Sequence, residues 1–374
     1  MSFKKTGLFI SSIIVAVIIG LLIGYFIGNG QTKSRYETEH ELDIRLNRGE
    51  LEGLGEIEGP IYVTGHKTPD SDTVCSAIAY AALLQMMGYD AHPVVLGEIN
   101  HETKYILEQA GIEAPPLLDD ASGCNMILVD HSEYAQSAEG LKDANILMII
   151  DHHGDGSVTT GNPLIYDARP IGATSTIIWM RYRNYGFEPD GKVAFALAGA
   201  ILSDTVNLES VSTTSADIEA FSALSKLAGL NDKDAFYQNM FIASLSYEGM
   251  TAEEIILSDY KEYDGGGQKF AIGVINAYDK DAALQMIESI KGALPGMAEK
   301  TGMDMTFVQI SIFHDDMNIT YLLPSDKAAA EVIETAYGDT AIYDGTSYML
   351  EPGISRKKDL VPAITAILEA HPQE

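Results

Sequence analysis

The sequence of 374 residues is poor in cysteine and in basic side chains. It has only two cysteines, Cys75 and Cys124, which excludes a disulfide framework; both lie among apolar residues, so we interpret them as core residues. Lysine and arginine number 24 against 54 aspartates and glutamates, which gives a net charge of −30. Nucleic-acid binding depends on neutralising phosphates, so we expect no nucleic-acid partner. A phosphate-bearing ligand would need a local basic cluster or metal cations.

Charge is missing altogether from residues 7–28, which are almost wholly apolar. About 22 helical residues at about 1.5 Å each are long enough to span a hydrocarbon core. No small-residue cleavage site clearly follows, so we expect an uncleaved membrane anchor over residues 1–30 rather than a cleaved signal peptide. More basic residues follow the segment than precede it, which favours a single-pass protein of the cell membrane with the rest of the chain on the cytoplasmic face. The opposite orientation stays open.

After a charged stretch, the sequence from residue 60 to about 230 alternates strand-like and helix-like segments. The strand-like runs lie at 61–64, 93–96, 126–129 and 146–150. The helix-like runs lie at 73–87, 102–109, 135–141, 175–185 and 193–202. Alternation of this kind predicts βαβ units, and therefore an α/β fold with a doubly wound parallel sheet.

The pattern changes around residues 235–260, where helix-like sequence runs through Met240 to Ser258. Beyond this point strands are expected at 270–275, 306–312 and 318–323, and helices at 279–292, 326–336 and 360–370. We therefore predict a second, smaller α/β domain with its own core. The expected parts of the chain are the anchor over 1–30, an acidic stalk over 31–59, a first domain over 60–245 and a second domain over 246–374.

Acidic residues and histidines follow several of the apolar runs. They are His66, Asp70, Asp72, Asp130, His152, His153 and Asp204. A parallel sheet places ligands at the carboxyl ends of its strands, so these side chains are expected to meet. Carboxylates with a minority of imidazoles suit manganese, magnesium or iron better than zinc, and the many carboxylates favour two ions that share ligands. Taken singly, an aspartate could cap a helix and His152 could be a core histidine; their joint occurrence favours a metal site.

The triplet at residues 151–153 (DHH) is the signature of the DHH phosphoesterase superfamily. The surrounding sequence resembles one branch, the family II manganese-dependent inorganic pyrophosphatases. Similar motifs occur in matching order at 65–80, 129–131, 170–176, 201–204 and 355–358. Lys261 stands where the family keeps a substrate lysine. The resemblance covers residues 60 to 370 or so, with a DHH metal-binding catalytic domain followed by a substrate-binding domain.

The resemblance implies two Mn²⁺ ions, or Co²⁺ or Mg²⁺ in their place, and a further Mg²⁺ with the substrate. One ion would bind His66, Asp70, Asp130 and Asp204, and the other would bind Asp72, Asp130, His152 and Asp204. The implied reaction is hydrolysis of inorganic pyrophosphate to two phosphates by a hydroxide that both metals activate. Catalysis would involve Asp130 and His153, the latter as a proton donor beside the substrate. The phosphate oxygens would be bound by His153, Lys261, Arg356 and Lys357. A homodimer stays open.

The sequence departs from the family pattern after two motifs. Ser132 stands where the family usually has asparagine, and Gly154 where it often has arginine; neither change removes an expected ligand. A short-chain exopolyphosphatase needs the same chemistry and stays open as an alternative. A related phosphodiesterase is disfavoured because the predicted hairpin turn at 265–267 is followed by Gln268 rather than histidine. A tethered binding protein with a degenerate site is disfavoured because every expected metal position is present.

Overall fold

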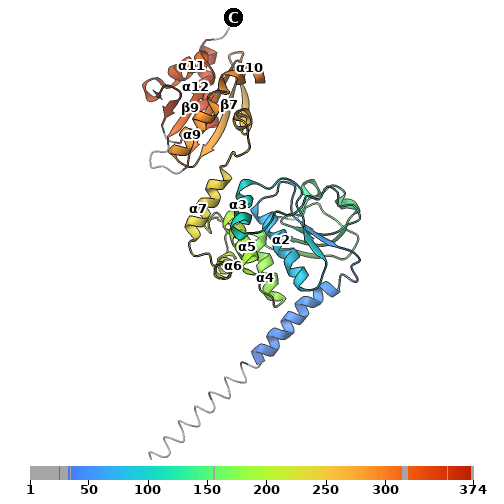
Figure 1. Cartoon of the computed structure of the whole chain (residues 1–374). Helices are drawn as coiled ribbons and strands as arrows, with labels where there is room; N and C mark the ends of the chain where they lie inside the picture. Colours follow the sequence, from blue (N-terminus) through green and yellow to red (C-terminus); the bar gives the residue numbers. More distant parts are fainter. Residues whose placement is uncertain are drawn as a thin grey trace, which may run out of the picture. The chain divides into compact units, whose positions relative to one another are not determined.

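The computed structural model describes residues 25, 33, 35–154, 156–313, 319–351 and 353–371. The chain divides into two compact units, Met1–Met240 and Phe241–Glu374 (Figure 1). The expected anchor at 7–28 lies outside the described residues, apart from Tyr25. Among the residues that the structure describes, no helix is both long and apolar enough to cross a membrane.

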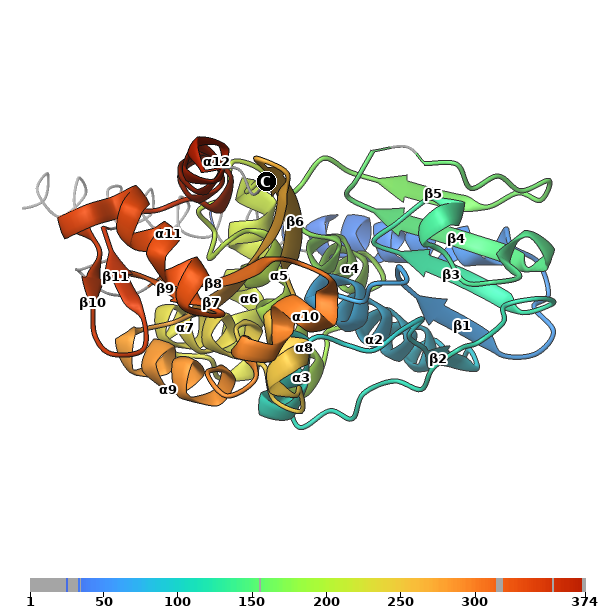
Figure 2. The ribbon, with the colours of Figure 1, turned by 90° about the horizontal axis from the view of Figure 1, so that it is seen from above.

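The first unit contains a five-stranded parallel sheet in the order β2-β1-β3-β4-β5, as Figure 2 shows. Its strands are β1 (Ile61–Thr64), β2 (Ala91–Pro93), β3 (Asn125–Val129), β4 (Asn145–Asp151) and β5 (Ile165–Ala168). The apolar runs of β3 and β4 are almost wholly buried, as expected for a parallel sheet covered on both faces. This confirms the predicted parallel sheet. Since β1 lies between β2 and β3, the strand order reverses there, at the position where α/β proteins bind ligands.

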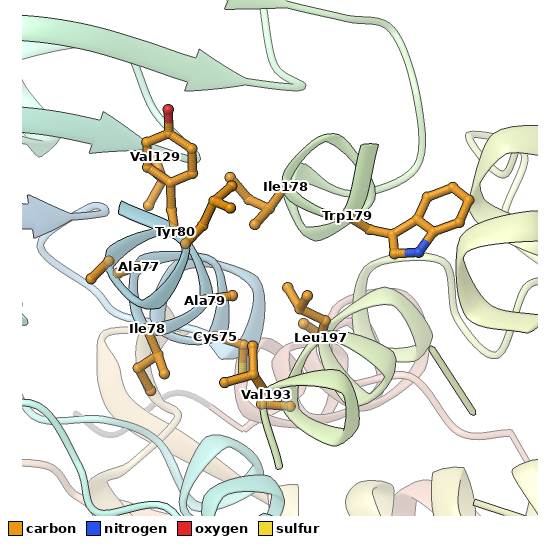
Figure 3. Packing of buried hydrophobic residues seen from close by; sticks show 14 of the residues in the cluster. Cys75, Ala77, Ile78, Ala79, Tyr80, Val129, Ile178, Trp179, Val193 and Leu197 are labelled. Carbon is orange, nitrogen blue, oxygen red and sulfur yellow. The ribbon is translucent and has the colours of Figure 1, made fainter. Parts of the chain in front are cut away.

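Helices of the first unit include α2 (Ser71–Met86), α3 (His101–Ala110), α4 (Thr174–Asn184), α5 (Gly191–Asp204) and α6 (Ser215–Ala228). The next helix, α7 (Lys233–Ser244), runs past Met240, where the first unit ends. The central one, α2, is buried along most of its length. Figure 3 shows it packed with Ile178 of α4 and with Val193 and Leu197 of α5, and all belong to one hydrophobic core. Cys75 lies in this core as predicted, whereas Cys124 is only half-buried. This packing fixes the N-terminal end of α2.

On the other face of the sheet the structure differs from one prediction, the short helix over 135–141. Met126 and Leu128 pack there against Leu141, in a segment predicted as one short helix over 135–141. The structure has two separate 3₁₀ turns instead, Tyr134–Gln136 and Leu141–Asp143. Gly140 adopts a left-handed conformation with φ 74°, which interrupts a right-handed helix.

The second unit has a mixed six-stranded sheet in the order β10-β11-β9-β8-β7-β6. Its strands are β6 (Tyr260–Gly265), β7 (Gln268–Ala277), β8 (Met305–Ile312), β9 (Thr320–Pro324), β10 (Ile342–Tyr343) and β11 (Tyr348–Leu350). Its α-helices are α8 (Ala252–Leu257), α9 (Lys280–Ile290), α10 (Met297–Thr301), α11 (Lys327–Tyr337) and α12 (Val361–Ala370). Strand β8 packs Val308 and Ile310 with α9 on one face and Phe307 with α11 and α12 on the other. The predicted α/β domain is therefore present.

Several predicted boundaries differ from the structure. The strand expected at 93–96 is β2 at Ala91–Pro93, and Val95 makes only an isolated bridge with Leu117. The helix-like sequence before residue 260 forms α7 and α8, and Lys261 lies on β6. The predicted hairpin turn is present between β6 and β7, where Gly266 and Gly267 have φ 60° and 79°.

The segment expected to be a solvated stalk is partly docked on the first unit. Residues 35–52 are helical, and the side chain of Leu51 is only 3% exposed. The Arg48 Nε donates a hydrogen bond to the Tyr185 backbone oxygen at 2.7 Å, at the C-terminal end of α4. A Cβ on Gly186 would approach Ile44 of this helix to 2.8 Å. A few apolar residues suffice for this contact. The charge-mixed sequence of the segment therefore does not reveal it.

Candidate metal centre

Three predicted ligands come from the loop and helix that follow β1. Asp70 is the N-cap of α2, and its Oδ1 accepts a hydrogen bond from the Thr73 backbone N–H at 2.9 Å. Its Oδ2 lies 3.2 Å from Nε2 of His66. Asp72 does not cap the helix. Its fully buried carboxylate accepts hydrogen bonds from the backbone N–H groups of Thr174 and Ser175, at 2.6 and 2.8 Å. These N–H groups belong to the first turn of α4, where the helix dipole also favours a negative charge.

Asp130 follows β3 directly and lies at the centre of the site. Its φ of 62° is left-handed, an unusual conformation for a residue with a side chain. Hydroxyl groups hold its buried carboxylate from two helices: Thr73 Oγ1 donates to Oδ2 at 2.7 Å, and Thr174 Oγ1 donates to Oδ1 at 3.1 Å. Strained backbone of this kind often occurs at functional sites, where the surrounding contacts enforce it.

The two histidines after β4 are oriented differently. The His152 Nδ1 lies 3.0 Å from the Ile171 backbone oxygen, a pure acceptor, so the ring carries a proton on Nδ1. Its Nε2 lies 3.4 Å from both Asp130 Oδ1 and Asp204 Oδ2, and it is buried without a hydrogen-bond partner. His152 is therefore not a satisfied core histidine.

His153 has a carboxylate partner of its own. Its backbone N–H and its ring Nδ1 both contact Oδ1 of Asp151, at 3.0 and 2.9 Å. The Asp151 side chain is fully buried, whereas the His153 side chain is 56% exposed. The pair leaves Nε2 of His153 available to a ligand.

All the predicted metal ligands lie in overlapping groups whose ligand atoms are within 4.8 Å of one another. The groups are His66, Asp70 and Asp130; Asp72, Asp130, His152 and Asp204; and Asp130, His152 and His153. Asp130 belongs to every group. Asp204 is grouped with the second set, and its sharing with the first set stays a prediction. The unpaired Nε2 of His152 between two carboxylate oxygens fits a divalent cation, and the carboxylate-rich donor set fits Mn²⁺ or Mg²⁺.

The charges of the cluster also fit a cation. Burial raises the pKa of Asp72 well above its usual value, and it raises the pKa of Asp204 to about 6. Burial disfavours charged imidazoles too, yet the nearby carboxylates of Asp130 and its neighbours raise the pKa of His66 to about 10 and that of His152 to about 12. In the metal-free protein, protons thus supply positive charge that ions would supply when bound.

The predicted phosphate-binding residues lie in the second unit. Lys261, Arg356 and Lys357 line one hollow of about 450 Å³, together with Asp259, Tyr263, Val274, Gln309 and Ser355. The Arg356 guanidinium donates to the backbone oxygen and to Oδ1 of Asp259, at 2.7 and 2.8 Å. Both lysine side chains are exposed. The structure therefore brings the three basic residues together.

Sequence reasoning assigned no role to the groups that hold the ligands in place. These include the hydroxyls of Thr73 and Thr174 and the carboxylate of Asp151. Each lies within a motif that the sequence shows. The partner of Thr73 and Thr174 is Asp130, in a distant segment, so no spacing rule could identify those two contacts, whereas Asp151 contacts His153 only two residues away.

Comparison with known proteins gives matches along most of the chain. The sequence model described as "DHH family, N-terminal domain" matches residues 60–203, and the one described as "DHHA2 domain" matches residues 238–367. The manganese-dependent inorganic pyrophosphatase of Methanothrix thermoacetophila is 36% identical, over 81% of this chain and 97% of the relative. A protein of Archaeoglobus fulgidus assigned as a manganese-dependent inorganic pyrophosphatase is 35% identical, over 82% of this chain and 98% of the relative.

Similarity extends to a solved structure. The crystal structure of a Methanococcus jannaschii protein assigned to the family II inorganic pyrophosphatases is 34% identical, with a TM-score of 0.50. The match covers 82% of this chain and 98% of that protein.

Proposed function

This chain belongs to the manganese-dependent inorganic pyrophosphatases of the DHH family, and from that premise we propose how its residues hydrolyse inorganic pyrophosphate to two phosphates. The observation that carries the proposal is the buried cluster around Asp130, in which the Nε2 of His152 lacks a partner between two carboxylates. Such a cluster is costly to bury unless cations compensate it.

We propose that one divalent ion binds His66, Asp70 and Asp130 and that a second binds Asp72, Asp130, His152 and Asp204, with Mn²⁺ as the cofactor. When bound, the ions lower the pKa of water and neutralise charge on the phosphates. Asp204 is assigned to the first ion as well, in line with the family resemblance. Thr73 and Thr174 orient the Asp130 carboxylate so that both of its oxygens face ligand groups.

His153 is assigned as the proton donor to the leaving phosphate. The hydrogen bond with Asp151 raises the pKa of His153, although burial opposes the shift. The ring therefore keeps its proton to higher pH than an ordinary histidine. Because Asp151 occupies Nδ1, the proton at Nε2 is the one that can be donated to the substrate.

Lys261, Arg356 and Lys357 are assigned to the phosphate oxygens. A guanidinium offers paired donors and an ammonium a point charge, which together suit a polyanion. The surrounding hollow lies in the second unit, so we assign residues 246–374 to substrate binding and residues 60–245 to metal binding and catalysis. A further Mg²⁺ would accompany the substrate.

The test is phosphate release by the full chain from pyrophosphate and from tripolyphosphate, with Mn²⁺ and then with excess chelator. We expect fast hydrolysis of pyrophosphate that the chelator abolishes. A preference for tripolyphosphate would keep the site and change the substrate to short polyphosphate. Absence of hydrolysis in the presence of bound Mn²⁺ would contradict the proposal.

We further propose that residues 7–28 anchor the protein in the cell membrane, with the catalytic domain on the cytoplasmic face. The support is the uncharged apolar sequence of that segment and the excess of basic residues after it. Protease treatment of intact cells should leave the catalytic domain uncut, and cell lysis should expose it. Recovery of the protein in the fraction free of membranes would contradict the anchor. Size determination in detergent would show whether the chain forms a homodimer.

A further inference from the structure

One carboxylate outside the metal cluster connects two of the segments that carry its ligands. Glu102 lies in the first turn of α3, and its Oε1 accepts hydrogen bonds from two serine hydroxyls. One comes from Ser71 at 2.7 Å and the other from Ser203 at 2.5 Å. Ser71 stands between Asp70 and Asp72, and Ser203 directly precedes Asp204. A single oxygen atom therefore joins the start of α2 to the end of α5.

The surroundings of Glu102 hold it firmly in this position. Asn100 caps α3 by accepting a hydrogen bond from the Thr103 backbone N–H at 2.8 Å. The hydroxyl of Thr103 is buried and lies 3.2 Å from that of Ser71. Helix α3 also packs tightly on α5, because a Cβ added to Gly199 would lie 2.9 Å from Ile106. The helix that carries Glu102 is thus close-packed against the helix that ends at Asp204.

We propose that Glu102 is a positioning residue for the metal centre, which sets the spacing between the ligands at the start of α2 and Asp204. It belongs to none of the groups that could hold an ion, and it acts through Ser71 and Ser203. The inference rests on the proposed function only in that the same cluster binds the ions. Outer hydrogen bonds that orient metal ligands typically change metal affinity by about 10–100-fold. A purely structural role is the alternative, since an acidic residue in a first turn also stabilises its helix.

The experiment measures Mn²⁺ affinity of the metal-stripped full chain by calorimetric titration and the electron paramagnetic resonance spectrum of the bound Mn²⁺. Glu102→Ala removes the acceptor, and we expect Mn²⁺ affinity to fall about 10–100-fold with a changed spectrum. Glu102→Gln keeps an oxygen that can accept both bonds, and it should stay within about threefold of the wild-type affinity, because the missing charge does not itself contact the ion.

Two controls separate positioning from helix stability. Glu108→Ala changes an exposed glutamate of the same helix and should leave affinity and spectrum unchanged. Asn100→Ala removes the cap of α3 and leaves the Glu102 acceptor in place. It should lower the melting temperature and reduce the Mn²⁺ affinity much less than Glu102→Ala does.

A Glu102→Ala protein with wild-type Mn²⁺ affinity and spectrum would overturn the inference, and so would an equal loss of affinity in Asn100→Ala. If Glu102→Ala does not fold, Ser71→Ala and Ser203→Ala replace it. Each should weaken Mn²⁺ binding, and wild-type affinity in the double variant would overturn the inference as well. A wild-type chain that binds Mn²⁺ and does not hydrolyse pyrophosphate would refute the proposed function and leave the role of Glu102 standing.

Discussion

The two units of this chain handle charge in opposite ways. In the first unit two aspartates of the metal cluster are buried, Asp72 at 0% and Asp130 at 1% exposed, and hydroxyl and backbone N–H groups from α2 and α4 hold them. In the second unit Lys261 and Lys357 are exposed, on a strand and a helical turn, and of the three basic residues Arg356 is the one that hydrogen bonds hold in place, to Asp259. Buried charges need compensation, whereas surface cations are solvated already. A substitution should therefore cost far more in the acidic cluster than in the basic hollow.

The largest effect is expected at the residue that all the ligand groups share. Asp130→Asn keeps the size of the side chain and tolerates the left-handed backbone, but it removes the negative charge. We expect the rate of pyrophosphate hydrolysis to fall by more than about 100-fold, which exceeds the loss typical of residues that only hydrogen-bond to metal ligands. The content of bound metal should fall as well. Metal analysis and phosphate release measure both. Asp119→Asn, at an exposed aspartate before β3, serves as the control, and a fully active Asp130→Asn protein would refute the site.

The acidic cluster should also make the Mn²⁺ affinity of the protein depend on pH. Burial opposes charge on the imidazoles, but the nearby carboxylates raise the pKa of His66 to about 10 and that of His152 to about 12. Both rings are thus protonated near pH 7.5 in the metal-free protein, and ligation must displace those protons. Apparent Mn²⁺ affinity should rise with pH, by up to about tenfold per pH unit for each displaced proton. Calorimetry in two buffers of different ionisation enthalpy counts the protons; affinity independent of pH between 6 and 8 or so would contradict the assignment.

The same raised pKa values stabilise the metal-free fold in a defined direction. A histidine whose pKa is higher in the folded chain contributes stability below its unfolded value of 6.5, and this contribution is lost as the pH rises through about 10. The metal-free protein should therefore lose stability at alkaline pH, which urea titrations at neutral and alkaline pH would measure. The second unit offers a contrast, because no histidine ring is part of its basic hollow.

In the basic hollow a smaller and different effect is expected. Lys357→Ala removes one exposed cation from the lining, and a charge-assisted hydrogen bond is worth about 1.5–3 kcal/mol. We expect KM for pyrophosphate to rise by about 10–100-fold with unchanged Mn²⁺ affinity, since the cluster in the first unit is untouched. Lys358→Ala is the matched control, because the neighbouring lysine does not line the hollow. Equal effects of the two substitutions would mean that only net charge matters there.

The sequence could predict that the metal ligands cluster, but it could not predict the contacts that hold them. The strands β3 and β4 end in Asp130 and in the triplet at 151–153, and a parallel sheet brings such ends together, so the clustering of these ligands was predictable. The atoms that hold these ligands in place were not predictable. Asp72 is bound by the first turn of α4, about a hundred residues away, and Glu102 meets Ser71 and Ser203 only in the folded chain. Such contacts depend on the packing of helices, which local patterns do not determine.

The smallest expected effect comes from the helix over residues 35–52, which contributes no residue to the acidic cluster or to the lining of the basic hollow. Arg48 lies 4.5 Å from the centre of the Phe187 ring and donates to the Tyr185 oxygen at the end of α4. Arg48→Ala should lower the melting temperature by about 2–4 °C, because one hydrogen bond contributes about 1 kcal/mol. Arg45→Ala, at an exposed position of the same helix, should change nothing. Since the opposite end of α4 holds Asp72, a loss of Mn²⁺ affinity in Arg48→Ala would show that this helix supports the metal centre as well as the fold.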